Sequence, residues 1–200
     1  MTPPIPQQRV TPEEYLAHER AAEVKSEYIA GQIYAMSGAG RAHGLINMNL
    51  SRLLSTQLGD QPCEAFASDM RVKVSAARLY TYPDLVVVCG EPLFEDAQVD
   101  TLLNPTLIVE VLSPSTEAYD RGAKFAYYRQ LPSLREYLLV AQDRILLDHF
   151  LRDEAGWRFT SAADPTAVAT LPAIGCALPV AEVYHKVAFA AEPPPAADAG

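Results

Sequence analysis

Two acidic residues lie within the most apolar runs of this chain. Asp84 opens the run 84–89, and Glu110 lies in the middle of the run 106–112. A carboxylate among isoleucine, valine and leucine side chains is unfavourable unless something compensates for its charge. Two carboxylates ~4 Å apart repel each other by roughly 4 kcal/mol at an effective dielectric constant near 20. If the two runs are neighbouring strands, one carboxyl group therefore holds a proton or a divalent cation lies between them.

Such a site suits Mg²⁺ or Mn²⁺, with a carbonyl and water molecules completing an octahedron of oxygen ligands. Each acid also has an ordinary structural interpretation. Asp84 follows a proline and could be a turn residue, and Glu110 could pair with an arginine across the sheet. The presence of an acid in both runs favours a site over these two alternatives.

Hydrophobic periodicity and turn residues predict the elements that carry these acids. Thr11 and Glu14 form a capping box at the start of the first helix. The predicted elements are a helix over 11–20, a hairpin over 27–34, a helix over 42–58, strands over 70–75, 83–89 and 106–112, a helix over 118–131, and strands over 136–140, 144–151 and 157–161. The runs 85–89 and 107–112 are apolar on both faces, which predicts a sheet covered on both sides and a mixed α/β fold.

Length and composition predict one soluble domain. The chain has 200 residues, 49% hydrophobic and 20% charged, which is ordinary for a globular protein. Its apolar runs all fall short of the ~18–20 residues that a membrane helix requires. We expect a single domain over residues 11–190, a flexible segment over 1–10 and a disordered tail rich in proline and alanine over 191–200.

The start of the chain and the cysteines indicate a cytoplasmic protein. The sequence MTPPIPQQRV has neither the basic nor the apolar segment of a secretory signal. Cys63, Cys89 and Cys176 are odd in number and widely spaced. We therefore expect three buried free thiols in a reducing compartment.

The charge of the chain limits how it could meet nucleic acid. A net charge of −9 repels polyanions at long range, which excludes a histone-like coating protein but not an enzyme with a local basic patch. The strand 70–75 is expected to carry Arg71 and Lys73 on its solvent-facing side. Scattered cations of this kind predict modest, salt-sensitive binding. The candidates for contact are Arg71, Lys73, Arg78, Arg121 and Arg129.

The order of three motif residues resembles a nuclease family. Pro83-Asp84, then Glu110 after 26 residues, then Lys124 in the next helix are similar to the PD-(D/E)xK nuclease superfamily, and within it the chain resembles the Uma2 family of restriction-endonuclease-like proteins. The resemblance covers roughly residues 11–187. It rests on the ordered segments 27–31, 43–44, 68–69, 83–88, 107–115 and 120–128.

The resemblance implies an α/β fold with a restriction-endonuclease-like core, in which a central mixed β-sheet is flanked by helices. It also implies a Mg²⁺- (or Mn²⁺-) dependent endonuclease that hydrolyses phosphodiester bonds of DNA and assembles as a homodimer. In the implied mechanism Asp84, Glu110 and the backbone carbonyl of Val111 hold the metal ion. The metal ion polarises the phosphodiester and lowers the pKa of a bound water.

One departure from the superfamily pattern concerns the lysine. That lysine usually lies two residues after the glutamate, where this chain has Leu112. The resemblance implies that Lys124 replaces it from the following helix and orients the water or stabilises the pentacovalent phosphorus. The structural alternative is an ion pair between Lys124 and Asp120, one helical turn away, worth about 0.3–0.5 kcal/mol.

Three further residues have a functional and a structural interpretation. Glu27 would reach the metal as a further acid, or it would lie solvated at the end of a strand. His43 would approach a phosphate or act as a base, or it would cap or pack against its helix. Tyr128, one turn beyond Lys124, is interpreted as core packing.

Two other classes of function stay open. One is a catalytically silent regulatory module that binds metal or nucleic acid, and the other is a structural interaction domain with strands 136–161 as a dimer surface. The negative net charge of the chain favours these two alternatives, whereas the buried unpaired carboxylates favour the enzyme. A phosphate-binding loop at 37–44 is disfavoured, because His43 replaces the third glycine and no Gly-Lys-Ser/Thr follows.

Overall fold

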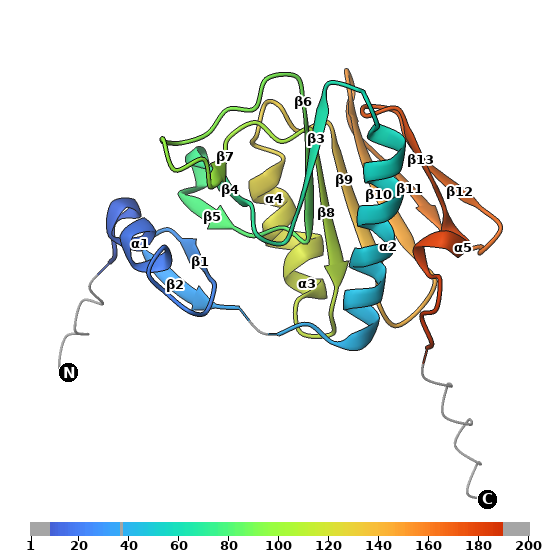
Figure 1. The fold of residues 1–200 in the computed structure, drawn as a ribbon, viewed down its shortest axis with the longest axis horizontal. Coiled ribbons are helices and arrows are strands. Elements are labelled where there is room, and N and C mark those ends of the chain that lie inside the picture. Colours follow the sequence, from blue (N-terminus) through green and yellow to red (C-terminus); the bar gives the residue numbers. More distant parts are fainter. Residues whose placement is uncertain (1–8, 37, 190–200) are drawn as a thin grey trace, which may run out of the picture.

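Two large β-sheets, a two-stranded sheet and the helices around them make up the described fold (Figure 1). The computed structural model describes residues 9–36 and 38–189. The ends that we expect to be flexible, 1–10 and 191–200, therefore lie almost wholly outside the described residues. Of the two described positions among them, Val10 donates its backbone N–H to the carbonyl of Gly31 and accepts a hydrogen bond from the hydroxyl of Tyr28.

The larger sheet has six strands in the order β11-β10-β9-β8-β6-β3. Its strands β8 and β9 are parallel and the other neighbours are antiparallel, so the predicted mixed sheet is confirmed. The strands are β3 (Cys63–Ala67), β6 (Leu85–Cys89), β8 (Leu107–Leu112), β9 (Glu136–Ala141), β10 (Leu147–Asp153) and β11 (Gly156–Ala162). Strand β10 begins later than predicted because residues 142–145 form the bend that reverses the chain.

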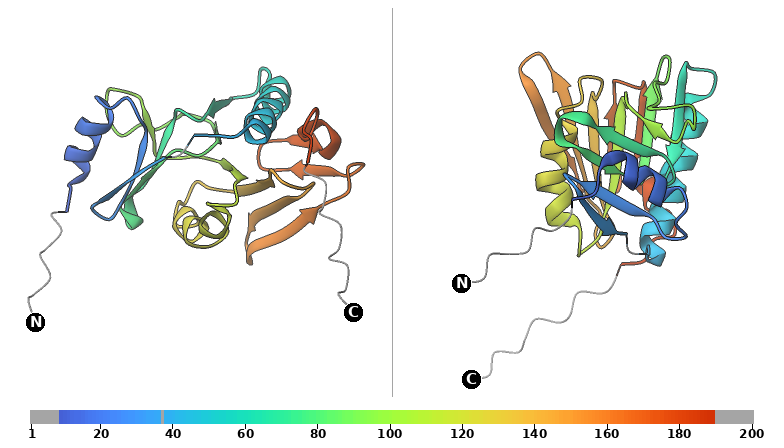
Figure 2. Two further views of the ribbon diagram at one scale, coloured as in Figure 1. Left: turned by 90° about the horizontal axis from the view of Figure 1, so that it is seen from below. Right: turned by 90° about the vertical axis from the view of Figure 1, so that its left-hand side faces the viewer.

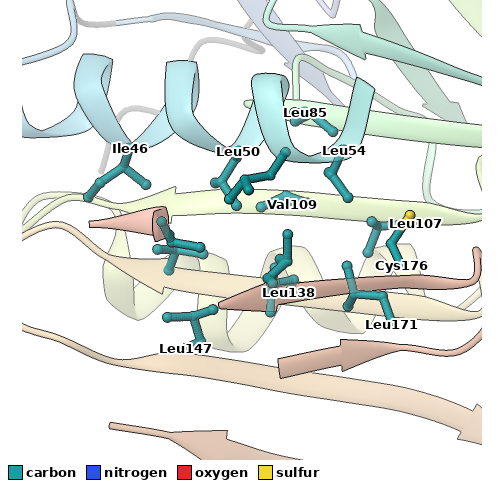
Figure 3. Close-up of a cluster of buried hydrophobic side chains, with 14 of the residues drawn as sticks. Ile46, Leu50, Leu54, Leu85, Leu107, Val109, Leu138, Leu147, Leu171 and Cys176 are labelled. Carbon is teal, nitrogen blue, oxygen red and sulfur yellow. The ribbon is translucent and has the colours of Figure 1, made fainter. Parts of the chain in front are cut away.

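Helix α2 (Arg41–Leu58) covers one face of this sheet. Its apolar side chains recur at helical spacing, as predicted, and Figure 3 shows Ile46, Leu50 and Leu54 lying against the strands, above Val109. The same core includes a small sheet of β12 (Val168–Leu171) and β13 (Cys176–Pro179), followed by α5 (Val180–Val183). This core fixes the start of α2 at the end of the sheet where Asp84 lies.

The other face is covered by a helical segment whose middle is not α-helical. Residues predicted as one regular helix over 118–131 instead form α3 (Glu117–Tyr119), the π-helical η2 (Asp120–Lys124) and α4 (Phe125–Tyr128). A π-helical turn within a helix is rare and is frequently found at functional sites. Here the π-helical turn carries both Asp120 and Lys124, which are buried against the sheet.

The smaller sheet stands to one side of this core (Figure 2), and its five strands have the order β2-β1-β5-β4-β7. Its bounds are β1 (Ser26–Ile29), β2 (Gln32–Ala35), β4 (Arg71–Val74), β5 (Leu79–Thr81) and β7 (Thr101–Leu102), with helix α1 (Pro12–Glu19) packed on it and the short 3₁₀ turn η1 (Ser75–Ala77) between β4 and β5. The predicted hairpin is confirmed as β1–β2. Its turn residues Ala30 and Gly31 have φ of 49° and 100°, the left-handed pair that a tight two-residue hairpin requires.

The expected position of Arg71 is wrong. Its side chain is buried rather than solvent-facing, because β4 lies between β5 and β7 with its edge covered. The guanidinium donates to the hydroxyls of Thr101 and Tyr82 at 3.1 and 2.9 Å and pairs with Asp100. Arg71 therefore acts as a structural cation inside the smaller sheet.

The expectation of three free thiols is also wrong. Cys63 and Cys89 are directly opposite each other on the antiparallel strands β3 and β6, with Cα atoms 4.0 Å apart, and they form a disulfide. The wide separation in sequence hides this pairing, which the sheet register creates. Only Cys176 matches the prediction, since it is free and buried.

Within residues 9–36 and 38–189, every helix is too short or too polar to cross a membrane.

Asp100, next to β7, pairs with Arg20 at the end of α1, and this pairing predicts how a substitution would change stability. Asp100 accepts hydrogen bonds from Arg20 at 2.8 and 2.9 Å and pairs with buried Arg71, and these partners hold the pKa of the Asp100 carboxyl well below its usual range. We expect Asp100→Asn to lower the free energy of unfolding by about 1–2 kcal/mol at pH 7. Urea denaturation followed by circular dichroism measures this loss.

The same variant has a defined pH dependence. Because the folded-state pKa of Asp100 is lowered, its contribution is complete above the ordinary aspartate pKa of about 3.9 and is lost as the pH falls through the folded value. The difference between wild type and Asp100→Asn should therefore shrink below about pH 4. Asp143→Asn, in an exposed pair with Arg144, is the control and should change stability by less than about 0.5 kcal/mol. A pH-independent loss in Asp100→Asn would contradict the assignment.

Candidate active site

The sheet register brings the two sequence-predicted acids together. Strands β6 and β8 are antiparallel neighbours with Leu85 opposite Val109, so the next pair along the ladder is Asp84 opposite Glu110. Residues directly opposite each other on antiparallel strands share a face and have Cβ atoms about 4.5–5.5 Å apart. The two apolar runs are thus neighbouring strands. This is the condition under which one of the two carboxyl groups is expected to hold a proton or to share a divalent cation with the other.

Both oxygens of the Asp84 carboxylate have protein partners. The backbone N–H of Val111 donates to one at 2.7 Å, and Nε2 of His43 lies 2.7 Å from the other. Burial lowers the pKa of His43, but the hydrogen bond and the negative charge of Asp84, helped by Asp120, raise it more, so the net pKa of His43 is raised. His43 thus contacts one of the two acids, and its predicted role toward a phosphate or as a base stays a prediction.

Lys124 reaches Glu110 from the π-helical turn. Its Nζ lies 2.9 Å from Oε1 of Glu110, 3.3 Å from Oε1 of Glu27 and 3.5 Å from Oδ1 of Asp120. The i,i+4 pair with Asp120 exists, but it is the longest of the three contacts. The lysine thus lies at the end of β8 although the position two residues after the glutamate in that strand is occupied by Leu112.

The cluster contains more buried negative than positive charge. Burial raises the pKa of Glu110 well above its ordinary value, opposed by the charge of Lys124 and reinforced by Asp120 and Asp84. For Lys124, burial lowers the pKa, but Glu110, Glu27 and Asp120 together raise it well above its ordinary value. Besides burial, the pKa shifts of Glu110 and Lys124 depend on the same arrangement of charges, in which a single ammonium group faces three carboxyl groups. The ammonium keeps its proton, and burial favours a proton on Glu110 as well.

A second layer of hydroxyl groups orients these carboxylates. Tyr128 is fully buried and donates its hydroxyl hydrogen to Oε1 of Glu110 at 2.8 Å. The hydroxyls of Tyr128 and Thr81 are 3.4 Å apart, and Thr81 donates to Oε1 of Glu27. Glu110, Tyr128, Thr81, Glu27 and Lys124 therefore form a closed ring of polar contacts. The interpretation of Tyr128 as core packing was incomplete, and only its position one turn after Lys124 could have signalled this role.

These residues open onto a hollow of about 930 Å³ between the hairpin β1–β2, the start of α2 and the segment 113–124. Asp84, Glu110, Val111 and Lys124 all line it, and so do Glu27 and His43. A hollow of this volume is in the range of substrate-binding clefts. The site is thus reachable from solvent although its central carboxylate and ammonium are buried.

The donor set fits a divalent cation that keeps several water ligands. Within residues 9–36 and 38–189, no three or more His, Cys, Asp or Glu side chains form a ready metal-binding group. Mg²⁺ in nucleotide-processing sites is usually bound through one or two carboxylates together with water and phosphate oxygens. Asp84 and Glu110, with the Val111 carbonyl beside them, provide that smaller set, and their excess negative charge favours a cation.

Three of the five basic residues predicted to contact nucleic acid lie in structural pairs. Arg71 is buried, as described above, and Lys73 pairs with Glu95. Arg121 donates to Glu117 at 2.8 Å and to Asp148 at 2.6 Å. The geometry brings none of these three side chains into the hollow.

Comparisons with known proteins identify the family of the chain. A family model named Uma2 and described as "Putative restriction endonuclease" matches residues 12–181. The chain belongs to the Uma2 family. Two uncharacterised proteins from Synechocystis sp. (strain ATCC 27184 / PCC 6803 / Kazusa) are similar to this chain. The protein sll1609 is 43% identical over 141 residues, which cover 70% of this chain and 80% of sll1609. The protein slr1290 is 37% identical over 188 residues, which cover 94% of this chain and 98% of slr1290.

A solved structure extends the agreement to the fold. It is described as the crystal structure of "a putative nuclease belonging to DUF820 from Anabaena variabilis ATCC 29413", and it matches with a TM-score of 0.73 at 17% identity, over 88% of this chain and 97% of that chain. The similarity confirms the restriction-endonuclease-like α/β fold. The family expected from the motifs is confirmed as Uma2.

Tyr128→Phe tests the second layer of this Uma2 site. Removing the hydroxyl leaves Glu110 with one donor fewer in a buried position, so we expect a loss of about 1–3 kcal/mol in the free energy of unfolding. Tyr127→Phe, in which the neighbouring hydroxyl is removed outside the ring of contacts, should change stability by less than about 0.5 kcal/mol. Chemical denaturation of both variants compares them, and equal losses would show that Tyr128 does not hold Glu110.

Proposed function

We propose that this protein is a Mg²⁺-dependent endonuclease that hydrolyses phosphodiester bonds, with DNA as substrate. The observation that carries the proposal is the convergence of Asp84, Glu110 and Lys124 at one end of the β6–β8 pair, facing a solvent-filled hollow. The family and the fold are of the nuclease kind, which supports the same reaction class. A purely structural domain has no reason to keep an acidic cluster of this kind under an open cleft.

Asp84, Glu110 and the Val111 carbonyl would hold Mg²⁺ or Mn²⁺. When bound, the cation polarises the phosphodiester and makes a bound water more acidic. The backbone N–H of Val111 and Nε2 of His43 fix the orientation of the Asp84 carboxylate. Tyr128 and Lys124 do the same for Glu110.

Lys124 would donate to the attacking water or to a non-bridging phosphate oxygen, where negative charge develops as the ester bond breaks. Its side chain is almost fully buried and keeps its proton, so it acts as a fixed positive charge rather than as a base. Glu27 holds the ammonium from the side of the smaller sheet. His43 orients Asp84 and lies at the mouth of the site, where a phosphate would enter.

A homodimer and a cytoplasmic location remain predictions within this proposal. Strand β11 is the outer strand of the larger sheet and carries an exposed phenylalanine, Phe159. It is therefore the part of the segment 136–161 that is best placed to meet a second copy. Light scattering coupled to gel filtration gives the mass in solution.

Cleavage of supercoiled plasmid is the direct test of the proposed reaction. With Mg²⁺ or Mn²⁺ we expect nicking by the wild type, none in EDTA and none above background for Asp84→Ala, because the variant loses a metal ligand. Asp143→Ala removes an exposed acid outside the hollow and should nick like the wild type. Equal inertness of wild type and Asp84→Ala on DNA and RNA would favour the silent binding module, and activity retained in Asp84→Ala would indicate a contaminant.

Lys124→Met separates metal binding from hydrolysis. Without the ammonium group, the carboxylates of the cluster lack their only buried cation, so binding of Mn²⁺ measured by calorimetry should persist or become tighter. Nicking should fall by about 10²–10³-fold, the range seen when one donor to a developing oxyanion is removed. The metal-free variant should also be less stable by about 3–5 kcal/mol. Full activity with this variant would remove Lys124 from the reaction.

A further inference from the structure

We infer that the hollow binds unpaired nucleotides rather than duplex, with a base stacked on Tyr34 beside the reactive centre. This inference rests on the proposed function and names its substrate class. It follows from two kinds of side chain that line one hollow. The acidic centre and a group of exposed apolar side chains both line it.

The cations of the hollow are all engaged. Among the described residues that line it, the basic side chains are Lys25, His43 and Lys124. Lys25 pairs with Asp69 and donates to the carbonyl of Ser68 at 2.9 Å, and the other two are held by the carboxylates described above. The acidic side chains that line it are more numerous: Glu23, Glu27, Asp69, Asp84, Glu110 and Asp120.

A duplex is poorly matched to such a surface. Proteins that grip duplex DNA neutralise several phosphates with free lysine and arginine side chains, typically 6–10 in a salt-dependent complex. Among the described residues that line the hollow, every basic side chain is already paired, so a phosphate would be attracted chiefly by a divalent ion at Asp84 and Glu110 and by Lys124 beside it. The remaining binding energy must come from contacts that do not depend on phosphate charge.

Exposed apolar side chains that line the same hollow offer contacts of this kind. Eight large apolar side chains of the described residues are exposed, and three of them, Val24, Tyr34 and Met48, line this one hollow. They come from the chain before β1, from β2 and from α2, so they gather there by folding and not by sequence. The Tyr34 ring is nearly half exposed, and its hydroxyl donates to Oε1 of Gln32 at 2.6 Å, which fixes the orientation of the ring.

The register of the hairpin places Tyr34 beside the reactive centre. Tyr34 is directly opposite Glu27 in the β1–β2 pair, so both side chains lie on the same face. Glu27 in turn contacts Nζ of Lys124 at 3.3 Å. A base stacked on Tyr34 would therefore belong to a nucleotide next to the phosphate that Lys124 approaches. In a duplex that base is stacked and paired, and its face is not available.

The experiment measures binding of fluorescein-labelled oligothymidylate, oligouridylate and a duplex of equal length by anisotropy in Ca²⁺, with gels to verify that the strands stay intact. We expect the single strands to bind more tightly than the duplex, and the oligothymidylate and oligouridylate arms decide between DNA and RNA. Tyr34→Ala should weaken single-strand binding about tenfold, since stacking on an aromatic side chain is worth about 1–3 kcal/mol per base. Tyr34→Phe keeps the ring and should bind like the wild type.

Leu93→Ala is the matched control, because it removes a similarly exposed apolar side chain outside the hollow and should leave binding unchanged. The slope of log K against log salt should be shallower than about −2, as expected for one or two phosphate contacts. Duplex bound as tightly as single strands, a steep salt slope, or full affinity in Tyr34→Ala would each overturn the inference, and so would no binding at all.

The outcomes for this inference and for the proposed function are distinct. Tyr34-dependent binding of single strands without cleavage under Mg²⁺ or Mn²⁺ would sustain the substrate class and refute hydrolysis. Asp84-dependent nicking of duplex that is insensitive to Tyr34→Ala would do the reverse.

Discussion

The ammonium group of Lys124 lies among carboxylates that come from both sheets of the molecule. Glu27 belongs to β1 of the smaller sheet, Glu110 to β8 of the larger one, and Asp120 to the π-helical turn that carries the lysine itself. Removing ions from water is costly, and the cost is recovered only when partners and hydrogen bonds are well placed. The hydroxyls of Tyr128 and Thr81 complete that placement. These polar contacts hold the two sheets together at the site, in addition to the apolar core that the sheets share through Val72, Val74 and Leu79 on one side and Val86, Val88 and Ile108 on the other.

The same cluster explains why the covering helix is irregular. A regular α-helix places residues i and i+4 almost on one line along its axis. In the π-helical turn the chain is wider, and Asp120 and Lys124 are both buried against the sheet at their separation of 3.5 Å. Tyr128 lies in the α-helical turn that follows, and its hydroxyl donates a hydrogen bond to Glu110. The local departure from α-helical geometry therefore coincides with the residues that carry the charge.

The sequence predicts the part of the site that depends on strands. An acid in a run of β-branched residues is visible without a structure, and the pairing of β6 with β8 turns Asp84 and Glu110 into neighbours. The helix α2 and the hairpin β1–β2 are likewise visible, because their periodicity and turn residues are strong. Lys124 is found only through the family pattern, since a lysine four residues after an aspartate is equally typical of a solvent-exposed pair.

The features that were missed depend on which residues lie opposite each other across the sheets. The hydroxyls of Thr81 and Tyr128 belong to residue types that pack into cores everywhere, so their polar role is invisible until Glu27 and Glu110 are placed. The alternation of apolar and polar residues predicts that Arg71 faces solvent. In the structure, β7 pairs with its strand and Asp100 pairs with its guanidinium, and both come from a distant part of the chain. Cys63 and Cys89 are far apart in sequence and adjacent only through the β3–β6 register. The short strands β5, β7, β12 and β13 are missed for the same reason, because their pairing partners and not their own periodicity define them.

The acidic character of the chain is consistent with a nuclease once the charges are located. A net charge of −9 opposes binding of any polyanion at long range, and three of the cations predicted to contact nucleic acid, Arg71, Lys73 and Arg121, are held in ion pairs within the fold. The carboxylates that remain uncompensated are concentrated where a divalent cation would reverse the local sign of the charge. Under the proposed function, attraction for phosphate would be confined to the reactive centre, and the rest of the substrate would be held by the exposed apolar side chains Val24, Tyr34 and Met48 that line the same hollow. The net charge of the protein would repel a polyanion at a distance, whereas a divalent cation at the reactive centre would attract a phosphate nearby. This combination would favour a substrate that brings one phosphate and an exposed base into the hollow together.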